Sequence, residues 1–136
     1  MTTDTDTPEK PPAEAASPAA ISRGLIRRCD RAVLSTAMAG SGWPYGSLVM
    51  TACDHAARPL LSDLAEHTKN LGADNRASLL FDGTAGLDNP LTGARVTVTG
   101  HLSPADDPAL VARYTARHPD SEMYAGFADF NLYAMT

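Results

Sequence analysis

Cysteine, aromatic residues and long apolar runs are all scarce in this sequence of 136 residues. Its two cysteines, Cys29 and Cys53, lack the spacing of a metal-binding pair, so we expect reduced thiols and no zinc site. No apolar run approaches the length of a membrane span, and the N-terminus lacks the charged-then-apolar layout of an export signal. These absences predict a cytoplasmic protein without a metal centre.

Positive charge is also in deficit. The net charge of -5 argues against sequence-independent nucleic-acid binding, which requires a clustered basic surface. A hydrophobic content of 43% suits a modest globular core, and the length suits a single domain. Residues 1–20 are rich in Thr, Pro, Ala, Asp and Glu without apolar periodicity, which predicts a disordered tail followed by one domain over residues 21–136.

Within that domain, short apolar segments alternate with turn residues. Apolar residues at helical spacing predict a first helix from Ile21 to about Arg31. Its arginines form either a solvated basic face or a partner-binding patch, and they are Arg23, Arg27, Arg28 and Arg31. Strands are predicted at 33–38, 47–53, 59–61, 77–81, 95–100 and 130–135, and a helix from Pro108 to about Arg117. Hairpin-joined strands that outnumber the helices predict an antiparallel barrel or strongly curled sheet with peripheral helices.

The segment from Pro59 to Phe81 organises the rest of the chain. Its two apolar ends predict strands, and the residues between them predict one compact helix, with Ser62 or Asp63 as its N-cap. Near the first turn of that helix, free backbone N–H groups favour an anion. The polar residues at this position are His67, Thr68 and Lys69. They form either a phosphate site or the solvent-facing side of an ordinary amphipathic helix.

Several segments together carry a family resemblance. They are residues 44–49, 58–71, 76–81 and 93–100, and the likeness continues through Arg113-Tyr114, His118-Pro119 and residues 124–130. In this order they resemble the FMN-binding split-barrel family related to pyridoxamine 5'-phosphate oxidase. The closest branch is that of the haem-utilisation (HugZ-type) proteins, and the likeness covers about residues 22–136.

The resemblance implies an antiparallel split β-barrel that forms a homodimer with two FMN molecules at the subunit interface. By position, Ser47 would line the flavin, and Ser62 and Asp63 would meet its ring or ribityl chain. Arg95 would reach the FMN of the partner subunit. The residues implied to hold the phosphate are His67, Thr68 and Lys69.

The chemistry of these residues is compatible with FMN. Its phosphate carries nearly two negative charges, which Lys69 and a helix N-terminus would offset. In a flavoprotein the cofactor performs the redox chemistry, so no catalytic triad or carboxylate pair is required, and none is evident. We therefore expect an FMN-dependent oxidoreductase, with a non-catalytic flavin or haem binding protein, acting as carrier or sensor, as the alternative. No catalytic residue or substrate is assigned.

Other side chains leave two interpretations open. Trp43 and Tyr45 either stack on a flavin or pack the barrel rim. His101 and His118 are either haem ligands or structural and solvent-facing histidines.

The sequence departs from the family in two places. It lacks the additional C-terminal domain that longer haem-utilisation members carry, and it stops at Thr136, where relatives continue with further barrel strand. We therefore expect a truncated sequence or a barrel completed by a partner, with an open strand edge at the C-terminus.

Overall fold

The first described helix and strand follow directly from local sequence. The computed structural model describes residues 17–62, 65–123 and 131–136. Helix α2 (Pro18–Arg28) begins inside the predicted tail, because Ser17 caps it by accepting from the Ala20 N–H at 3.5 Å and Pro18 occupies the first turn. The helix ends at Arg28, and Arg31 belongs to strand β1 (Arg31–Ala37). The prediction that the helix extends to about Arg31 is therefore wrong.

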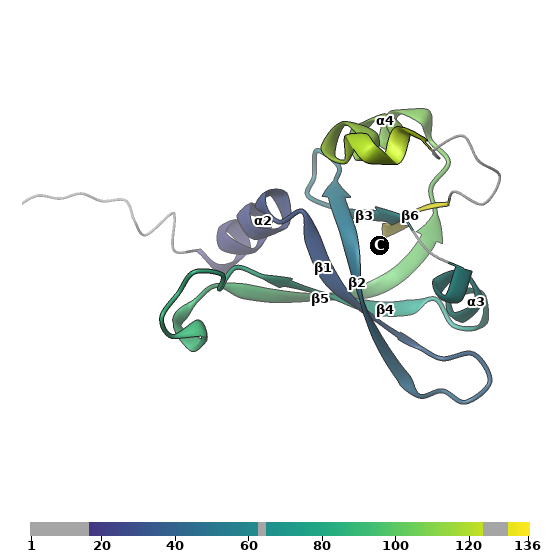
Figure 1. Cartoon of the computed structure of the whole chain (residues 1–136), viewed down its shortest axis with the longest axis horizontal. Helices are drawn as coiled ribbons and strands as arrows, with labels where there is room; N and C mark the ends of the chain where they lie inside the picture. The colour runs from purple at the N-terminus through teal and green to yellow at the C-terminus, as the bar shows by residue number, and fades with distance from the viewer. Residues whose placement is uncertain (1–16, 63–64, 124–130) are drawn as a thin grey trace, which may run out of the picture.

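The remaining strands form the predicted antiparallel barrel. They are β2 (Pro44–Cys53), β3 (Pro59–Ser62), β4 (Arg76–Asp82), β5 (Arg95–Pro104) and β6 (Leu132–Met135). Their order around the closed barrel is β1-β2-β3-β6-β5-β4 (Figure 1). Helix α3 (Ala65–Ala73) connects β3 to β4, and helix α4 (Pro108–Arg117) lies in the connection between β5 and β6. Two 3-10 segments, η2 (Pro90–Thr92) and η3 (Pro119–Met123), complete the described elements.

Strand β6 closes the barrel, which corrects the expectation of an open edge. It pairs with β3 through Leu60 and Ala134, and with β5 through Leu102 and Met135. Closure is possible because β5 continues past Gly100, where the predicted strand ended. A Cβ at Gly100 would collide with the carbonyl of Thr136, so glycine permits the close approach of the two chain segments.

Alternate strand residues fill the barrel with apolar side chains. The fully buried members of this core include Leu34, Leu61, Leu79, Phe81 and Leu102. Leu25 and Ile26 of α2 join the same core, whereas α4 covers a second apolar cluster through Tyr114. Each buried side chain of this size contributes about 1.5–3 kcal/mol relative to exposure.

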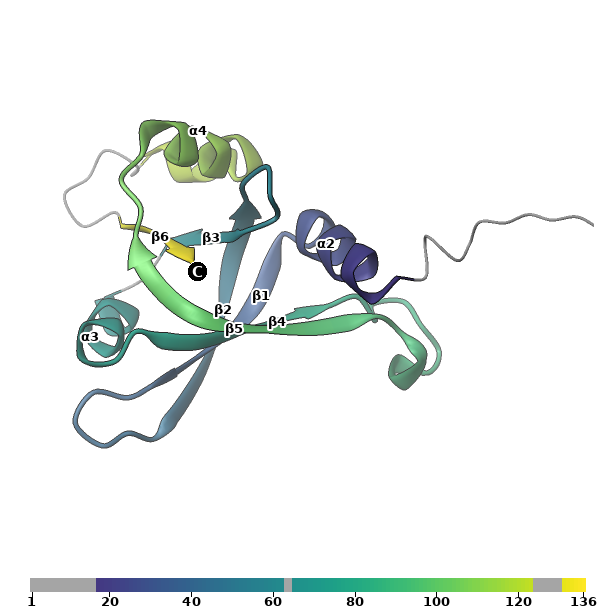
Figure 2. The ribbon, with the colours of Figure 1, turned by 180° about the vertical axis from the view of Figure 1, so that it is seen from behind.

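Two hairpins extend beyond the barrel in opposite directions. The β1–β2 hairpin points away from α2, and the β4–β5 hairpin points away from α3 (Figures 1 and 2). Trp43, near the tip of the first hairpin, is 71% exposed, so it does not pack the barrel rim. Among the residues that the structure describes, no helix is long and apolar enough to cross a membrane.

Candidate flavin site

A buried asparagine positions α3, the helix predicted to bind phosphate. The Asn70 side chain is fully buried, and its Oδ1 accepts the Ala39 N–H at 3.0 Å while its Nδ2 donates to the Thr36 Oγ1 at 3.4 Å. These bonds fix α3 against the end of β1 and the turn that follows it. Sequence reasoning missed Asn70, because nothing in a short polar helix distinguishes a buried asparagine from a solvated one.

The predicted phosphate ligands lie in the first half of α3. His67, Thr68 and Lys69 are the third to fifth residues of a helix that begins at Ala65. The first four N–H groups of a helix have no intrahelical acceptor, so this end is suited to an anion. Lys69 is exposed, one position before the buried Asn70. The side chains of His67 and Thr68 are outside the described residues.

The two serines assigned to the flavin lie on separate strands. Ser62 is the last residue of β3, and its hydroxyl is 2.9 Å from the Tyr114 hydroxyl of α4. This position and partner exclude Ser62 as the N-cap of α3, and Asp63 is outside the described residues. Ser47 is half-buried on β2 opposite Leu34, on the strand face that points into the barrel. The Ser62–Tyr114 pair was not predicted, since it joins residues far apart in the sequence.

Arg95 lies far from α3 within one chain. It is the first residue of β5 and pairs with Asp82 at the end of β4, whereas α3 adjoins the start of β4 at Arg76. These two positions are six residue steps apart along β4, which corresponds to roughly 20 Å. The Arg95 guanidinium donates to the Pro90 carbonyl at 3.2 Å. A single chain therefore does not bring Arg95 and the predicted phosphate ligands together.

The outer face of the sheet carries an exposed apolar row. Leu48, Val33 and Leu80 are cross-strand neighbours on β2, β1 and β4, and they are 62%, 39% and 38% exposed. In the next row, Ser35 pairs with Ser78, and both residues line a hollow of about 540 Å³. The outer face thus combines an apolar row with a hydroxyl-lined hollow.

Charged residues border that hollow. The Arg76 guanidinium contacts the Asp74 carboxylate at 2.7 Å, and its hydrogen bonds lower the pKa of Asp74 to about 2. The Asn75 Oδ1 lies 2.9 Å from the His101 Nδ1. This end of the sheet therefore holds two bonded polar pairs, of which Asp74, Arg76 and His101 line the hollow.

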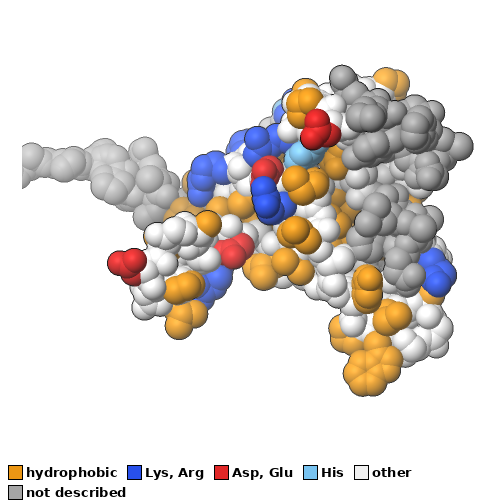
Figure 3. Space-filling model, in the orientation of Figure 1, with side chains coloured by type: hydrophobic (Ala, Val, Ile, Leu, Met, Phe, Trp, Pro, Cys, Tyr) orange, Lys and Arg blue, Asp and Glu red, His pale blue; other side chains and the backbone are white. Residues whose placement is uncertain are grey.

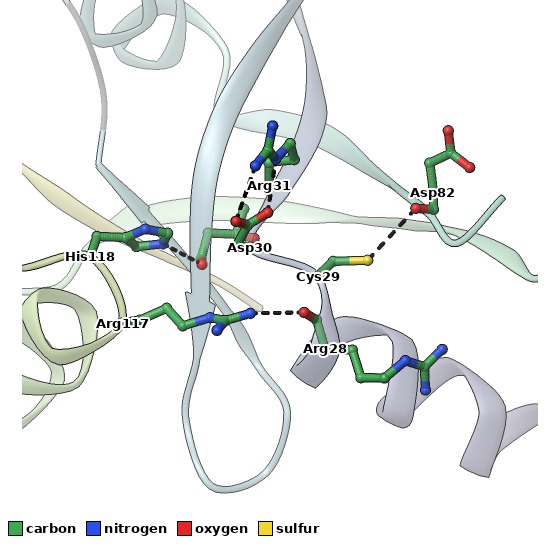
Figure 4. Close-up of polar contacts among 8 residues, drawn as sticks. Arg28, Cys29, Asp30, Arg31, Asp82, Arg117 and His118 are labelled. Atoms are coloured by element: carbon green, nitrogen blue, oxygen red, sulfur yellow. Dashed lines mark hydrogen bonds and ion pairs between the residues drawn. The ribbon is translucent and has the colours of Figure 1, made fainter. Parts of the chain in front are cut away.

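His118, one of the two candidate haem ligands, has a structural partner. The His118 Nε2 donates to the Thr51 carbonyl at 2.7 Å, and its ring lies 5.0 Å from the Tyr114 ring. Figure 4 shows the imidazole directed at β2 from the end of α4. His118 therefore holds α4 on the barrel.

The closed antiparallel sheet, with helices at its connections, defines a protein of the split-barrel class. Its sequence matches the family described as pyridoxamine 5'-phosphate oxidase over residues 21–135, and the chain belongs to that family.

Several relatives of this chain are named for haem, which agrees with the predicted closeness to the haem-utilisation branch. The chain is 38% identical over 96 residues to the chloroplast non-canonical heme oxygenase HOZ of Arabidopsis thaliana, covering 67% of this chain and 29% of that protein. It thus spans less than a third of that curated relative.

Two solved structures have a similar fold. A heme binding protein from Mycobacterium smegmatis matches with a TM-score of 0.75 and 26% identity, covering 85% of this chain and 49% of that chain. The heme storage protein HutZ from Vibrio cholerae matches with a TM-score of 0.70 and 15% identity, covering 84% and 85%, a likeness of fold alone.

Proposed function

We propose that this protein is an FMN-dependent oxidoreductase that works as a homodimer with flavin bound between its two copies. The first half of α3 and Lys69 of one copy bind the phosphate, together with His67 and Thr68. Arg95 reaches the same flavin from the other copy. The separation of roughly 20 Å between Arg95 and α3 within one chain carries this proposal, because it leaves the family's ligand set incomplete without a second copy.

The exposed apolar row supports the proposed dimer. Leu48, Val33 and Leu80 form a continuous strip on a sheet face, and such a strip is more typical of an interface than of a monomer surface. A two-fold axis through this face would pair the strip with its own copy, since an isologous interface uses the same patch twice. The hydroxyl-lined hollow beside it would then lie at the edge of the interface.

The donors of this chain fit the phosphate of FMN. A lysine amine and a helix N-terminus both favour a dianion, and a hydroxyl and an imidazole add donors. Bound FMN would supply the electron transfer. The chain's own residues bind and orient it, with Ser62 and Asp63 toward its ring and ribityl chain. Cys29 and Cys53 are both free thiols, in keeping with a cytoplasmic location.

Titration of the full-length protein with FMN tests the phosphate assignment. Lys69→Ala removes one charge-assisted hydrogen bond, so FMN affinity should fall by about 1.5–3 kcal/mol. Arg23→Ala removes an equal charge on α2, remote from α3, and should leave affinity unchanged. Equal FMN affinities for Lys69→Ala and the wild-type protein would exclude Lys69 as a phosphate ligand.

The cross-subunit assignment requires a separate test. Arg95→Ala should weaken FMN binding without loss of the fold, because the Arg95 side chain is exposed and its hydrogen bond within the described residues is to the nearby Pro90 carbonyl. Light scattering should give a dimer for both proteins. An unaltered FMN affinity in Arg95→Ala, or a monomer that binds FMN fully, would refute the shared site.

The second candidate function is a non-catalytic flavin or haem carrier or sensor. The 38% identity to a protein named as a heme oxygenase favours testing haem alongside FMN. Visible spectra of the protein as purified, and after separate addition of FMN and haem, distinguish flavin bands from a Soret band. NAD(P)H-driven turnover with an electron acceptor would support the enzyme, and tight FMN binding without turnover would support the carrier.

A further inference from the structure

A groove between α2 and α4 gathers arginines although the protein is acidic overall. It has a volume of about 440 Å³ and is lined by three arginines and three small residues, which are Arg27, Arg113, Arg117, Ala52, Cys53 and Ala116. Figure 3 shows basic side chains along α2 and toward α4 on the face in view. No acidic side chain lines the groove among the residues that the structure describes.

The three guanidinium groups are held in place by backbone carbonyls. Each donates one hydrogen bond, from Arg27 to His55 at 3.1 Å, from Arg113 to Cys53 at 3.0 Å and from Arg117 to Arg28 at 2.8 Å. Figure 4 shows the last of these contacts bridging α4 and the end of α2. A guanidinium carries five N–H donors, so each arginine keeps further donors for a ligand.

Ion pairs with carboxylates distinguish three other arginines of the chain from those of the groove. Arg31, Arg58 and Arg76 each contact a carboxylate within 3.0 Å. Within residues 17–62, 65–123 and 131–136, no carboxylate forms an ion pair with an arginine of the groove. Three positive charges therefore converge there without an ion pair among the described residues, and the carboxylate that Arg117 influences, Asp30, is paired with Arg31 instead.

We propose that this groove binds a small organic phosphate at a site separate from the flavin site on α3. One arginine fork already satisfies a planar carboxylate, whereas a phosphate offers three oxygens that can accept from donors on several sides. A volume of about 440 Å³ suits a metabolite and not a macromolecular surface. The small apolar residues of the lining leave room for the organic part of the ligand.

Calorimetric titration of the FMN-saturated full-length protein with pyrophosphate tests this proposal. One binding site per chain is expected, and Arg113→Gln and Arg117→Gln should each weaken it by roughly tenfold or more. Arg23→Gln makes the same charge change on α2 outside the groove and should alter the dissociation constant less than twofold. Circular dichroism of each variant confirms that the fold is retained.

Several results would overturn the proposal. Absence of pyrophosphate binding by the wild-type protein would refute it. Weakening of pyrophosphate binding by Arg23→Gln as large as that by Arg113→Gln would also refute it, because that result would indicate only a diffuse charge effect. Tighter binding of citrate than of pyrophosphate would reassign the groove to carboxylates. Displacement of FMN by pyrophosphate would show that the two ligands share one site.

Discussion

Replacement of Asn70 by leucine tests how α3 is held. The two side chains have the same number and branching of heavy atoms, so Asn70→Leu keeps the shape of the side chain but removes the bonds to the Ala39 N–H and the Thr36 hydroxyl. Thr36 is 5% exposed and would lose a partner away from water, whereas Ala39 is only half-buried and water can replace part of its bond. One lost bond of about 1 kcal/mol and one unsatisfied buried group of about 1–3 kcal/mol together predict a destabilisation of about 2–4 kcal/mol.

Urea unfolding monitored by circular dichroism measures this change. The midpoint should fall while the slope with urea stays the same, since the surface exposed on unfolding is unchanged. Asn75→Ala is the matched control, because its bond to His101 is exposed and water replaces it, so the loss should stay below about 1 kcal/mol. FMN affinity should also fall in Asn70→Leu, because α3 loses its position. An Asn70→Leu midpoint equal to that of the wild type would refute this account of α3.

Three further changes test the barrel and its surface. Gly100→Ala should destabilise the protein by about 1–3 kcal/mol in urea unfolding, because the new methyl group meets the Thr136 carbonyl. Thr51→Val should raise the melting temperature by an amount equivalent to about 1 kcal/mol, since the fully buried Thr51 hydroxyl has no hydrogen-bond partner among the residues that the structure describes. The pKa of Asp74 is depressed to about 2, so its stabilising effect is complete above its ordinary value of 3.8 and is lost as the pH falls toward 2. Arg76→Gln should therefore reduce the loss of stability measured between about pH 5 and pH 2.

Each of these three predictions has a result that would contradict it. An unchanged urea midpoint in Gly100→Ala would mean that β5 and the segment after β6 can separate without cost. A lower melting temperature in Thr51→Val would mean that the Thr51 hydroxyl has a partner, such as water. An acid-induced loss of stability as large in Arg76→Gln as in the wild type would assign that loss to other carboxylates.

Local signals predicted most of the elements. Asp107-Pro108 predicted the start of α4, short apolar runs between turn residues predicted β1, β2 and β4, and period-two alternation predicted β5. The start of α2 was missed because apolar periodicity begins at Ile21, whereas the capping signal is Ser17-Pro18. Helix limits thus depended on capping residues more than on hydrophobicity.

Relations between distant segments could not be predicted from the sequence. Closure by β6 depends on partners in β3 and β5, and its four residues alone do not identify them. The same holds for the site: the position of α3 was predicted, but its support by Asn70 and the remoteness of Arg95 were not. Charge alone also left the arginines of α2 ambiguous, because their convergence with Arg113 and Arg117 of α4 arises only in the folded chain.

The pairing of β6 with β3 and β5, which closes the barrel, constrains the order of folding. Its partners lie roughly seventy and thirty positions earlier in the chain, and such distant pairings are slow to form. During synthesis, β3 and β5 emerge from the ribosome before the strand that covers them, so both expose unpaired backbone edges for that interval. A nascent chain is therefore vulnerable to aggregation just before β6 emerges, and assistance from a chaperone would matter then.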